Sequence, residues 1–248
     1  MTIDDSSTSY GEIVRRLAGA QKVSLPGSPP YSVYVNRKVG RLIAAWAYRA
    51  GLTPNAVTAV SATLTFAGIL CIALVPPAPW TGILVWLLLA LGYAFDSADG
   101  QVARLRGGGS PAGEWLDHVV DAAKLSSLHI AVAIAMFRFF ALPSAWWLLL
   151  PLLYTVVSAV TFFGMILNDL LRQARGGGAA RRPGARSAAH TILLLPTDYG
   201  ILCLVFVLLG WPMVFTIAYG LFFIANLGAL ALALPRWFGQ MKQLGKES

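Results

Sequence analysis

Residues 50–95 read AGLTPNAVTAVSATLTFAGILCIALVPPAPWTGILVWLLLALGYAF, a stretch of 46 residues without Asp, Glu, Lys or Arg. A helix that crosses a bilayer needs about 20 mostly apolar residues. The stretch is therefore long enough for two crossings, and the prolines within residues 76–79 place a turn between them. This pattern predicts a polytopic membrane protein.

The composition of the whole chain agrees with this prediction. Of its 248 residues, 57% are hydrophobic and 12% are charged, whereas soluble domains carry about 25% charged residues. The mean hydropathy is +0.66. These values exclude a water-soluble globule and a disordered chain. Cys71 and Cys203 lie inside apolar stretches, so we expect no disulfide scaffold.

Two more uncharged stretches, residues 139–168 and 199–235, continue the pattern. The first predicts one crossing, and the second predicts two shorter ones that are separated near Gly210-Trp211-Pro212. A further helix carries charge in its first half. We therefore predict an all-α integral membrane fold with six transmembrane helices, roughly over residues 55–76, 80–106, 111–140, 143–173, 195–210 and 212–238.

The segments before and after these helices are more polar. Residues 1–30, rich in Ser, Gly and Pro, are expected to form a flexible cytoplasmic arm, and they show no signal peptide. Residues 31–50 mix basic and aromatic side chains, which suits an amphipathic helix along the cytoplasmic membrane surface. With this helix, the six-helix catalytic domain is expected over residues 31–240, followed by a cytoplasmic tail over 241–248.

Basic residues orient the predicted bundle. All of the 19 lysines and arginines except Lys124 and Arg138 fall on one side of it. The positive-inside rule places this side, with both termini, in the cytoplasm. Topology therefore accounts for the pI of 9.8, and no nucleic-acid partner is needed to explain it.

Three polar residues predict the starts of helices. Thr53 before Pro54 and Ser110 before Pro111 each combine an N-cap with a first-turn proline. Asp198 is expected to place its negative charge at the N-terminus of a helix. The short link before Pro111 predicts that the second and third transmembrane helices are antiparallel neighbours.

Four aspartates, Asp96, Asp99, Asp117 and Asp121, lie in the facing ends of these two helices. An ionisable group inside a bilayer marks a functional site by default. At about 100° per residue, each pair of aspartates lies on one face of its helix. Four carboxylates at close quarters need protons or cations, and oxygen ligands without His or Cys favour Mg²⁺, Mn²⁺ or Ca²⁺. A cytoplasmic metal site at membrane depth suggests a substrate with both a phosphate and a lipid.

Smaller and basic side chains share these faces. Gly100, Ala103 and Gly113 either leave room for a bulky group near the metals or serve close helix packing. Lys124 lies one turn beyond Asp121. It either neutralises Asp121 or Asp117 or helps to bind an anionic acceptor.

A basic segment that begins with Arg172 and Arg175 and continues to Arg186 also has two interpretations. It could cover an anionic acceptor or CDP-lipid. Alternatively, it reflects the positive-inside topology and attraction to anionic lipids.

Residues 96–121 run Asp-Ser-Ala-Asp-Gly-Gln-Val-Ala-Arg, then eight residues, then Gly, three residues, Asp, three residues and Asp. This resembles the signature of the CDP-alcohol phosphotransferase family, Asp-x-x-Asp-Gly-x-x-Ala-Arg-x8-Gly-x3-Asp-x3-Asp, and all eight fixed positions match. Residues 35–37 and 52–58 are similar to the family's entry into its first transmembrane helix.

The resemblance implies an enzyme that cleaves the pyrophosphate of a CDP-linked substrate, releases CMP and transfers the phospho-alcohol to a hydroxyl acceptor. Two divalent ions, Mg²⁺ or Mn²⁺, would be held by Asp96, Asp99 and Asp117, with Asp121 contributing to the second ion and acting as general base. The CDP moiety would contact Asp96, Gly100, Ala103, Arg104 and Gly113. The resemblance also favours a homodimer.

The transferred alcohol is less clearly indicated. Phosphatidylinositol-phosphate synthases usually have Ser after the third aspartate and Arg after the fourth, where this chain has His118 and Ala122. His118 is similar to choline and ethanolamine phosphotransferases, which transfer from a soluble CDP-alcohol to a lipid hydroxyl. The size and short tail instead favour a bacterial phosphatidyltransferase that uses CDP-diacylglycerol and a polar alcohol. An intramembrane prenyltransferase and a non-enzymatic cation carrier are remoter alternatives.

Overall fold

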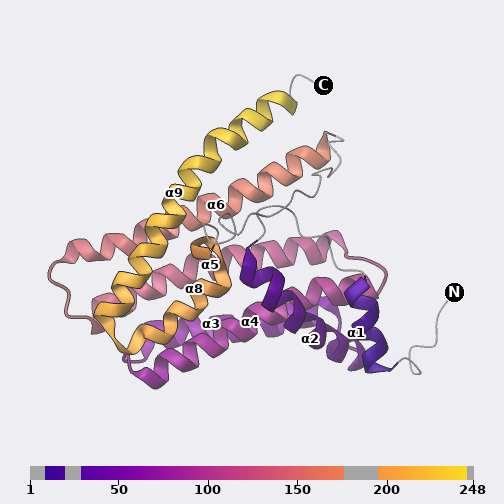
Figure 1. Cartoon of the computed structure of the whole chain (residues 1–248), viewed down its shortest axis with the longest axis horizontal. Helices are drawn as coiled ribbons and strands as arrows, with labels where there is room; N and C mark the ends of the chain where they lie inside the picture. Colours follow the sequence, from indigo (N-terminus) through magenta and orange to yellow (C-terminus); the bar gives the residue numbers. More distant parts are fainter. Residues whose placement is uncertain (1–8, 20–28, 176–194, 245–248) are drawn as a thin grey trace.

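The structure is a computed structural model that describes residues 9–19, 29–175 and 195–244. Figure 1 shows its long helices running along one elongated bundle, with the short helices α1 and α2 at one end. Among the described residues, five segments are long and apolar enough to cross a membrane. They are α3 (Pro54–Leu74), α4 (Pro79–Leu105), α5 (Pro111–Phe139), α6 (Leu149–Ala174, after the 3₁₀ turn Ala145–Leu148) and α9 (Pro212–Leu244).

The remaining apolar segment is shorter than the predicted crossing. The 3₁₀ turn Leu195–Thr197 precedes α8 (Tyr199–Val205), which continues as the 3₁₀ turn Phe206–Gly210. This last turn packs against α4. A Cβ on Gly210 would collide with the backbone at Pro79, so only glycine permits this approach.

The predicted N-terminal arm contains a packed helix. Helix α1 (Tyr10–Gly19) buries Ile13 and Leu17 against α2 (Arg37–Arg49). The expectation of a flexible arm is therefore wrong for this segment. The apolar side chains at positions 13 and 17 lie one turn apart and form a stripe that α2 covers.

A helix forms within residues 31–50, as predicted, beginning with the π-helical turn Ser32–Asn36 that leads into α2. Its small residues Gly40, Ala44 and Ala47 are buried, and a Cβ on Gly40 would lie 2.9 Å from Ser97 of α4. At the other end of the chain, α9 extends to Leu244, so the predicted tail begins as helix.

The interior lies between α3, α4 and α5 and is closed by α8 and α9. Ile72, Leu89, Val132, Phe206 and Tyr219 are fully buried there. By contrast, α6 and α9 expose much of their apolar surface. Such a surface is what a bilayer covers, and the chain is an integral membrane protein.

Candidate active site

The loop between α4 and α5 has the predicted caps. Ser110 Oγ accepts a hydrogen bond from the Gly113 N–H at 3.1 Å, and Pro111 begins the helix. Gly107 and Gly108 have φ angles of 96° and 131°, a region that favours glycine. However, α4 and α5 pack on α3 rather than closely on each other. The two helices still contact each other through side chains beside α3, as in the ion pair of Lys124 with Asp96.

Three of the four predicted aspartates come together. Asp96 and Asp99 of α4 and Asp117 of α5 each offer a carboxylate oxygen, and these oxygens lie within 4.8 Å of one another. Asp99 is buried, while Asp96 and Asp117 are partly exposed. A group of hard oxygen donors at this spacing fits a divalent cation such as Mg²⁺ or Mn²⁺.

Helix α3 orients this group. The Thr58 hydroxyl donates to Asp99 Oδ2 at 2.7 Å, and the Gly100 N–H donates to Asp99 Oδ1 at 2.5 Å. Thr58 is not among the predicted site residues. With Ser61 and Thr65 it forms a buried polar stripe along a mostly apolar helix. Polar residues at this spacing in a transmembrane helix could have indicated that α3 contributes to the site.

Asp121 lies outside the group of three and contacts Lys124. Lys124 Nζ is 3.2 Å from Asp121 Oδ1 and 2.5 Å from Asp96 Oδ1. It also donates to Ser61 Oγ at 3.0 Å. The structure therefore shows Lys124 neutralising aspartates. Its ion-pair partners are Asp121, as predicted, and Asp96; Asp117, the alternative partner in the prediction, forms no ion pair with Lys124 in the described structure.

The other motif residues lie in α4 and α5, the helices that carry the aspartates. Gly100 precedes the exposed Arg104 by one turn, and a Cβ on it would lie 3.7 Å from the Arg104 guanidinium. Ala103 is half-buried on the same helix. A Cβ on Gly113 would lie 3.3 Å from Asn55 Oδ1. A side chain at Gly100 would thus meet only Arg104, whereas one at Gly113 would come close to Asn55 and Ser110.

The match to known proteins agrees with this arrangement. Residues 51–235, about three quarters of the chain, match the CDP-alcohol phosphatidyltransferase family. The chain belongs to that family. This confirms the resemblance seen in the motif. Enzymes of the CDP-alcohol phosphatidyltransferase family transfer substituted phosphate groups with a divalent metal ion, which is the class of enzyme and cofactor expected from the sequence.

Individual relatives are similar over different lengths. The phosphatidylinositol phosphate synthase of Corynebacterium glutamicum is 44% identical over 72 residues, which are 28% of this chain and 30% of that protein. A crystal structure of Mycobacterium tuberculosis phosphatidylinositol phosphate synthase with CDP-DAG bound has a TM-score of 0.55 at 20% identity. The matched region covers 82% of this chain and 94% of the Mycobacterium chain. At this identity, the likeness is one of fold.

Two arginines predicted to contact an acceptor lie at the end of α6. Arg172 donates a hydrogen bond to Gln240 of α9, and Arg175 is the C-cap residue of α6. These ends of α6 and α9 lie at the same end of the bundle as the α4–α5 loop (Figure 1). The rest of the basic segment, including Arg181, Arg182 and Arg186, is outside the described residues.

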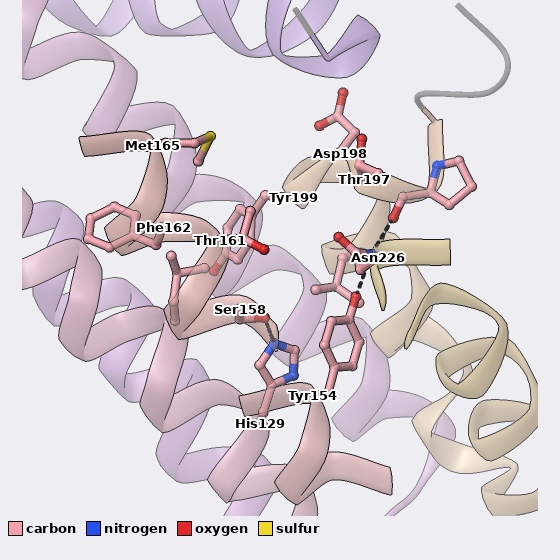
Figure 2. Close-up of a pocket in the computed structure, with 13 residues that line it drawn as sticks. His129, Tyr154, Ser158, Thr161, Phe162, Met165, Thr197, Asp198, Tyr199 and Asn226 are labelled. Atoms are coloured by element: carbon pink, nitrogen blue, oxygen red, sulfur yellow. Dashed lines mark hydrogen bonds between the residues drawn. The ribbon is translucent and has the colours of Figure 1, made fainter. Parts of the chain in front are cut away.

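A cavity of about 190 Å³ lies between side chains of α5, α6, α8 and α9. Figure 2 shows His129 and Tyr154 among the residues that line it, with Asn226 hydrogen-bonded to the Tyr154 hydroxyl. His129 Nδ1 lies 2.6 Å from the Tyr219 hydroxyl, and Nε2 lies 2.8 Å from Ser158 Oγ.

None of these residues is among the predicted site residues, although His129 is an ionisable residue inside a predicted transmembrane helix and therefore marks a functional or buried polar position. Asn226 Nδ2 contacts the Tyr154 hydroxyl at 2.9 Å and the Pro196 carbonyl at 2.8 Å. Because these polar groups are paired with one another, the network ties α5, α6 and α9 together.

Proposed function

We propose that this enzyme transfers a phosphatidyl group from CDP-diacylglycerol to a polar alcohol and releases CMP. The observation that carries the proposal is the group formed by Asp96, Asp99 and Asp117, whose oxygens lie within 4.8 Å at the ends of two apolar helices. A metal ion held there would face phosphates from the aqueous side, while the lipid chains of the same substrate stay in the bilayer.

The chemistry follows from the positions of the carboxylates. The bound metal ion would neutralise the pyrophosphate charge as a Lewis acid. The acceptor hydroxyl attacks the phosphorus that carries the lipid. A new P–O ester bond forms as the P–O bond to CMP breaks, and CMP leaves with the electron pair. Asp121 takes the hydroxyl proton, and its side chain is 27% exposed and thus accessible to an acceptor.

We assign binding of the cytidine nucleotide to the other motif residues. The exposed guanidinium of Arg104 suits a phosphate oxygen. Gly100, Ala103 and Gly113 would let the cytidine approach the helices closely. Arg172 and Arg175 remain predicted contacts of an anionic acceptor or lipid headgroup.

A cytoplasmic orientation is part of the proposal. The α4–α5 loop and the ends of α6 and α9 share one end of the bundle (Figure 1), and all of them carry basic residues. Helix α2 exposes Leu42 and Trp46, with 49% and 53% of their surfaces accessible, which suits a helix lying on the membrane surface.

The remaining architectural predictions concern crossings and assembly. We assign the sixth crossing to residues 195–210, which are apolar and pack on α4. The catalytic domain is then residues 31–240. The homodimer stays a prediction, and the exposed apolar side chains of α9 would face either a second copy or lipid.

The relatives favour a lipid donor over a soluble one. The Corynebacterium relative is named a phosphatidylinositol phosphate synthase, and the Mycobacterium structure of the same fold holds CDP-DAG. His118 and Ala122, however, differ from the residues that such synthases usually carry, so we write the acceptor as a polar alcohol.

CMP release tests the proposal. The purified protein, in lipid nanodiscs with Mg²⁺ or Mn²⁺, is given CDP-diacylglycerol or CDP-choline, each with a pool of acceptors. The acceptors are inositol phosphate, glycerol phosphate, inositol, serine and diacylglycerol. We expect CMP from CDP-diacylglycerol alone, and the mass of the lipid product names the alcohol. CMP from CDP-choline alone would instead establish transfer to a lipid hydroxyl, and CMP from neither donor would contradict the proposal.

A further inference from the structure

The cavity between α5, α6, α8 and α9 follows the part of α5 that carries Asp121. On its α6 side, the ring of Phe162 contacts the ring of His118, with centroids 6.5 Å apart, and His118 precedes Asp121 by three residues. Further along, Ser158 Oγ lies 2.8 Å from Nε2 of His129, which follows Asp121 by eight residues. Because α5 and α6 pack on each other, these two contacts bracket the position of Asp121 along the cavity.

The helical spacing of α5 gives the same placement. Leu125 and His129 line the cavity, and Asp121 lies four residues before Leu125. Residues four apart share one face of a helix and are separated by about 6 Å along its axis. The Asp121 side chain is 27% exposed. A hydroxyl group held at the Leu125 end of the cavity is therefore within reach of the proposed base.

The polar groups that line the cavity can both donate and accept further hydrogen bonds. The Thr161 hydroxyl donates to the Val157 carbonyl at 2.7 Å and keeps its lone pairs. The Tyr154 hydroxyl accepts from Asn226 Nδ2 at 2.9 Å and keeps its proton. Figure 2 shows Thr161, Tyr154 and Asn226 on the lining. Such a mixture of neutral donors and acceptors suits a ligand that carries several hydroxyl groups.

The charge of the described lining argues against an ionic ligand. Its carboxylate, that of Asp198, already accepts hydrogen bonds from the N–H groups of Gly200, Tyr31 and Ser32. It is therefore satisfied without a cationic ligand. An anion would be repelled by this carboxylate, and the described part of the lining contains no lysine or arginine to compensate for that.

The size of the cavity limits the ligand further. An apolar cavity of about 150 Å³ holds benzene, and the volume here is about 190 Å³. It therefore accommodates a ring of that size with hydroxyl groups. Leu125, Phe162 and Leu202 provide apolar surface for the carbon skeleton of such a ligand.

We propose that this cavity binds the acceptor, and that the acceptor is a small uncharged polyol with one hydroxyl group directed toward Asp121. This rests on the proposed function, in which the hydroxyl receives the phosphatidyl group of CDP-diacylglycerol. The proposal excludes phosphorylated alcohols and amino alcohols as the preferred acceptors.

Matched pairs of acceptors test the predicted charge. The full-length protein in nanodiscs is given CDP-diacylglycerol and Mg²⁺ with myo-inositol or inositol phosphate, and with glycerol or glycerol phosphate. The members of a pair differ only by a phosphate group. Because a buried charge without a partner is costly, we expect kcat/KM for CMP release to be about tenfold or more higher with the better neutral acceptor than with its phosphate. Choline provides the cationic comparison and should be a poorer acceptor than either polyol.

Two threonines of α6 provide a test of the position. Thr161→Val removes a hydroxyl from the cavity and preserves the shape of the side chain, so KM for myo-inositol should rise about 5–10-fold, while KM for CDP-diacylglycerol stays the same. Thr155→Val is the matched control, because Thr155 also donates to the carbonyl four residues earlier, at 3.0 Å, but is not part of the described lining. It should change neither KM, and a threonine with a merely structural role at position 161 would also change neither.

Binding without the donor is measured separately by saturation-transfer NMR with myo-inositol as the probe. We expect a signal in the wild type and in Thr155→Val. The signal should be lost in Thr161→Met, whose longer side chain fills part of the cavity. A signal that is absent from the wild type, or that Thr161→Met leaves unchanged, would overturn the inference.

Failure of the proposed function would look different. If CDP-diacylglycerol yields no CMP with any acceptor, the transfer itself is refuted, whereas the NMR experiment still decides whether the cavity binds a polyol. If CMP release is instead fastest with a phosphorylated acceptor or with choline, this inference is overturned and CDP-diacylglycerol remains the donor.

Discussion

Asp96 connects the two parts of the site at the scale of single residues. Its carboxylate joins the group with Asp99 and Asp117 and also pairs with Lys124, which in turn holds Asp121. Asp121 is therefore positioned by the ammonium at the edge of that group. Asp121 stays the predicted base and a predicted ligand of the second ion, next to the group of three.

Replacing the proposed base should reduce turnover far more than it affects folding. Asp121→Asn keeps the size of the side chain but cannot accept the proton, so we expect CMP release to fall by about 10²–10⁴-fold. Size-exclusion chromatography should show an unchanged profile. Asp169→Asn, at an exposed position near the end of α6, is the matched control and should keep the wild-type rate. A near-normal rate in Asp121→Asn would refute its role as base.

Removing the support of Asp99 should weaken metal binding. Thr58→Val deletes the 2.7 Å hydrogen bond to Asp99 but preserves the shape of the side chain. Losing such a partner typically costs about 10–100-fold in metal affinity, so the Mg²⁺ concentration for half-maximal CMP release should rise accordingly. Thr63→Val is the control on the same helix, because Thr63 is exposed and bonds only the Ala59 carbonyl in the structure. Equal Mg²⁺ requirements in both variants would contradict this prediction.

At the scale of elements, Asp198 links α8 to the segment before α2. Its Oδ1 caps α8 by accepting from the Gly200 N–H at 3.0 Å, as the sequence predicted. Its Oδ2 accepts from the Tyr31 N–H at 2.6 Å and the Ser32 N–H at 3.3 Å. The Tyr31 ring lies against Gly200, where a Cβ would overlap it. One carboxylate thus joins segments that are far apart in the chain.

Loss of this link should destabilise the N-terminal region. Asp198→Ala leaves three N–H groups without a partner, which together should cost about 2–4 kcal/mol. We expect a lower apparent melting temperature in detergent and faster proteolysis near residue 29. Ser144→Ala removes an exposed cap with a single hydrogen bond, to the Trp146 N–H, and should change little. If Asp198→Ala melted at the same temperature as the wild type, the hydrogen bonds of Asp198 would not contribute to the stability of the protein.

At the scale of the whole molecule, the aspartates and most of the described basic side chains lie at one end of the bundle. Arg138 ends α5 at the other end, where it donates to the Ala73 carbonyl. By the positive-inside rule, the basic residues place this end of the bundle in the cytoplasm, which is the orientation that the proposed function also requires.

Labelling from either side of the membrane checks that orientation. In a background without Cys71 and Cys203, Gly109→Cys marks the α4–α5 loop and Ala145→Cys marks the loop before α6; both positions are exposed. A membrane-impermeant maleimide should label Ala145→Cys in intact cells and Gly109→Cys only in inverted vesicles. The reverse pattern would place the site on the outer face and contradict the proposal.

The sequence by itself determined the class of fold, the long helices and the motif. Uncharged stretches specify membrane helices, and the caps at Thr53 and Ser110 form as predicted, with hydrogen bonds at 3.2 Å and 3.1 Å. These features are local, because hydropathy, helical phase and capping depend on residues within a few turns of one another.

The tertiary structure alone decided which side chains meet. It places Thr58 and Ser61 of α3 against the aspartates, pairs Lys124 with Asp96 and leaves Asp121 outside the group of three. It also packs α1 on α2. Such contacts depend on how separate helices approach one another. Because α3 lies beside both α4 and α5, its polar stripe completes a site that the two motif helices do not form alone.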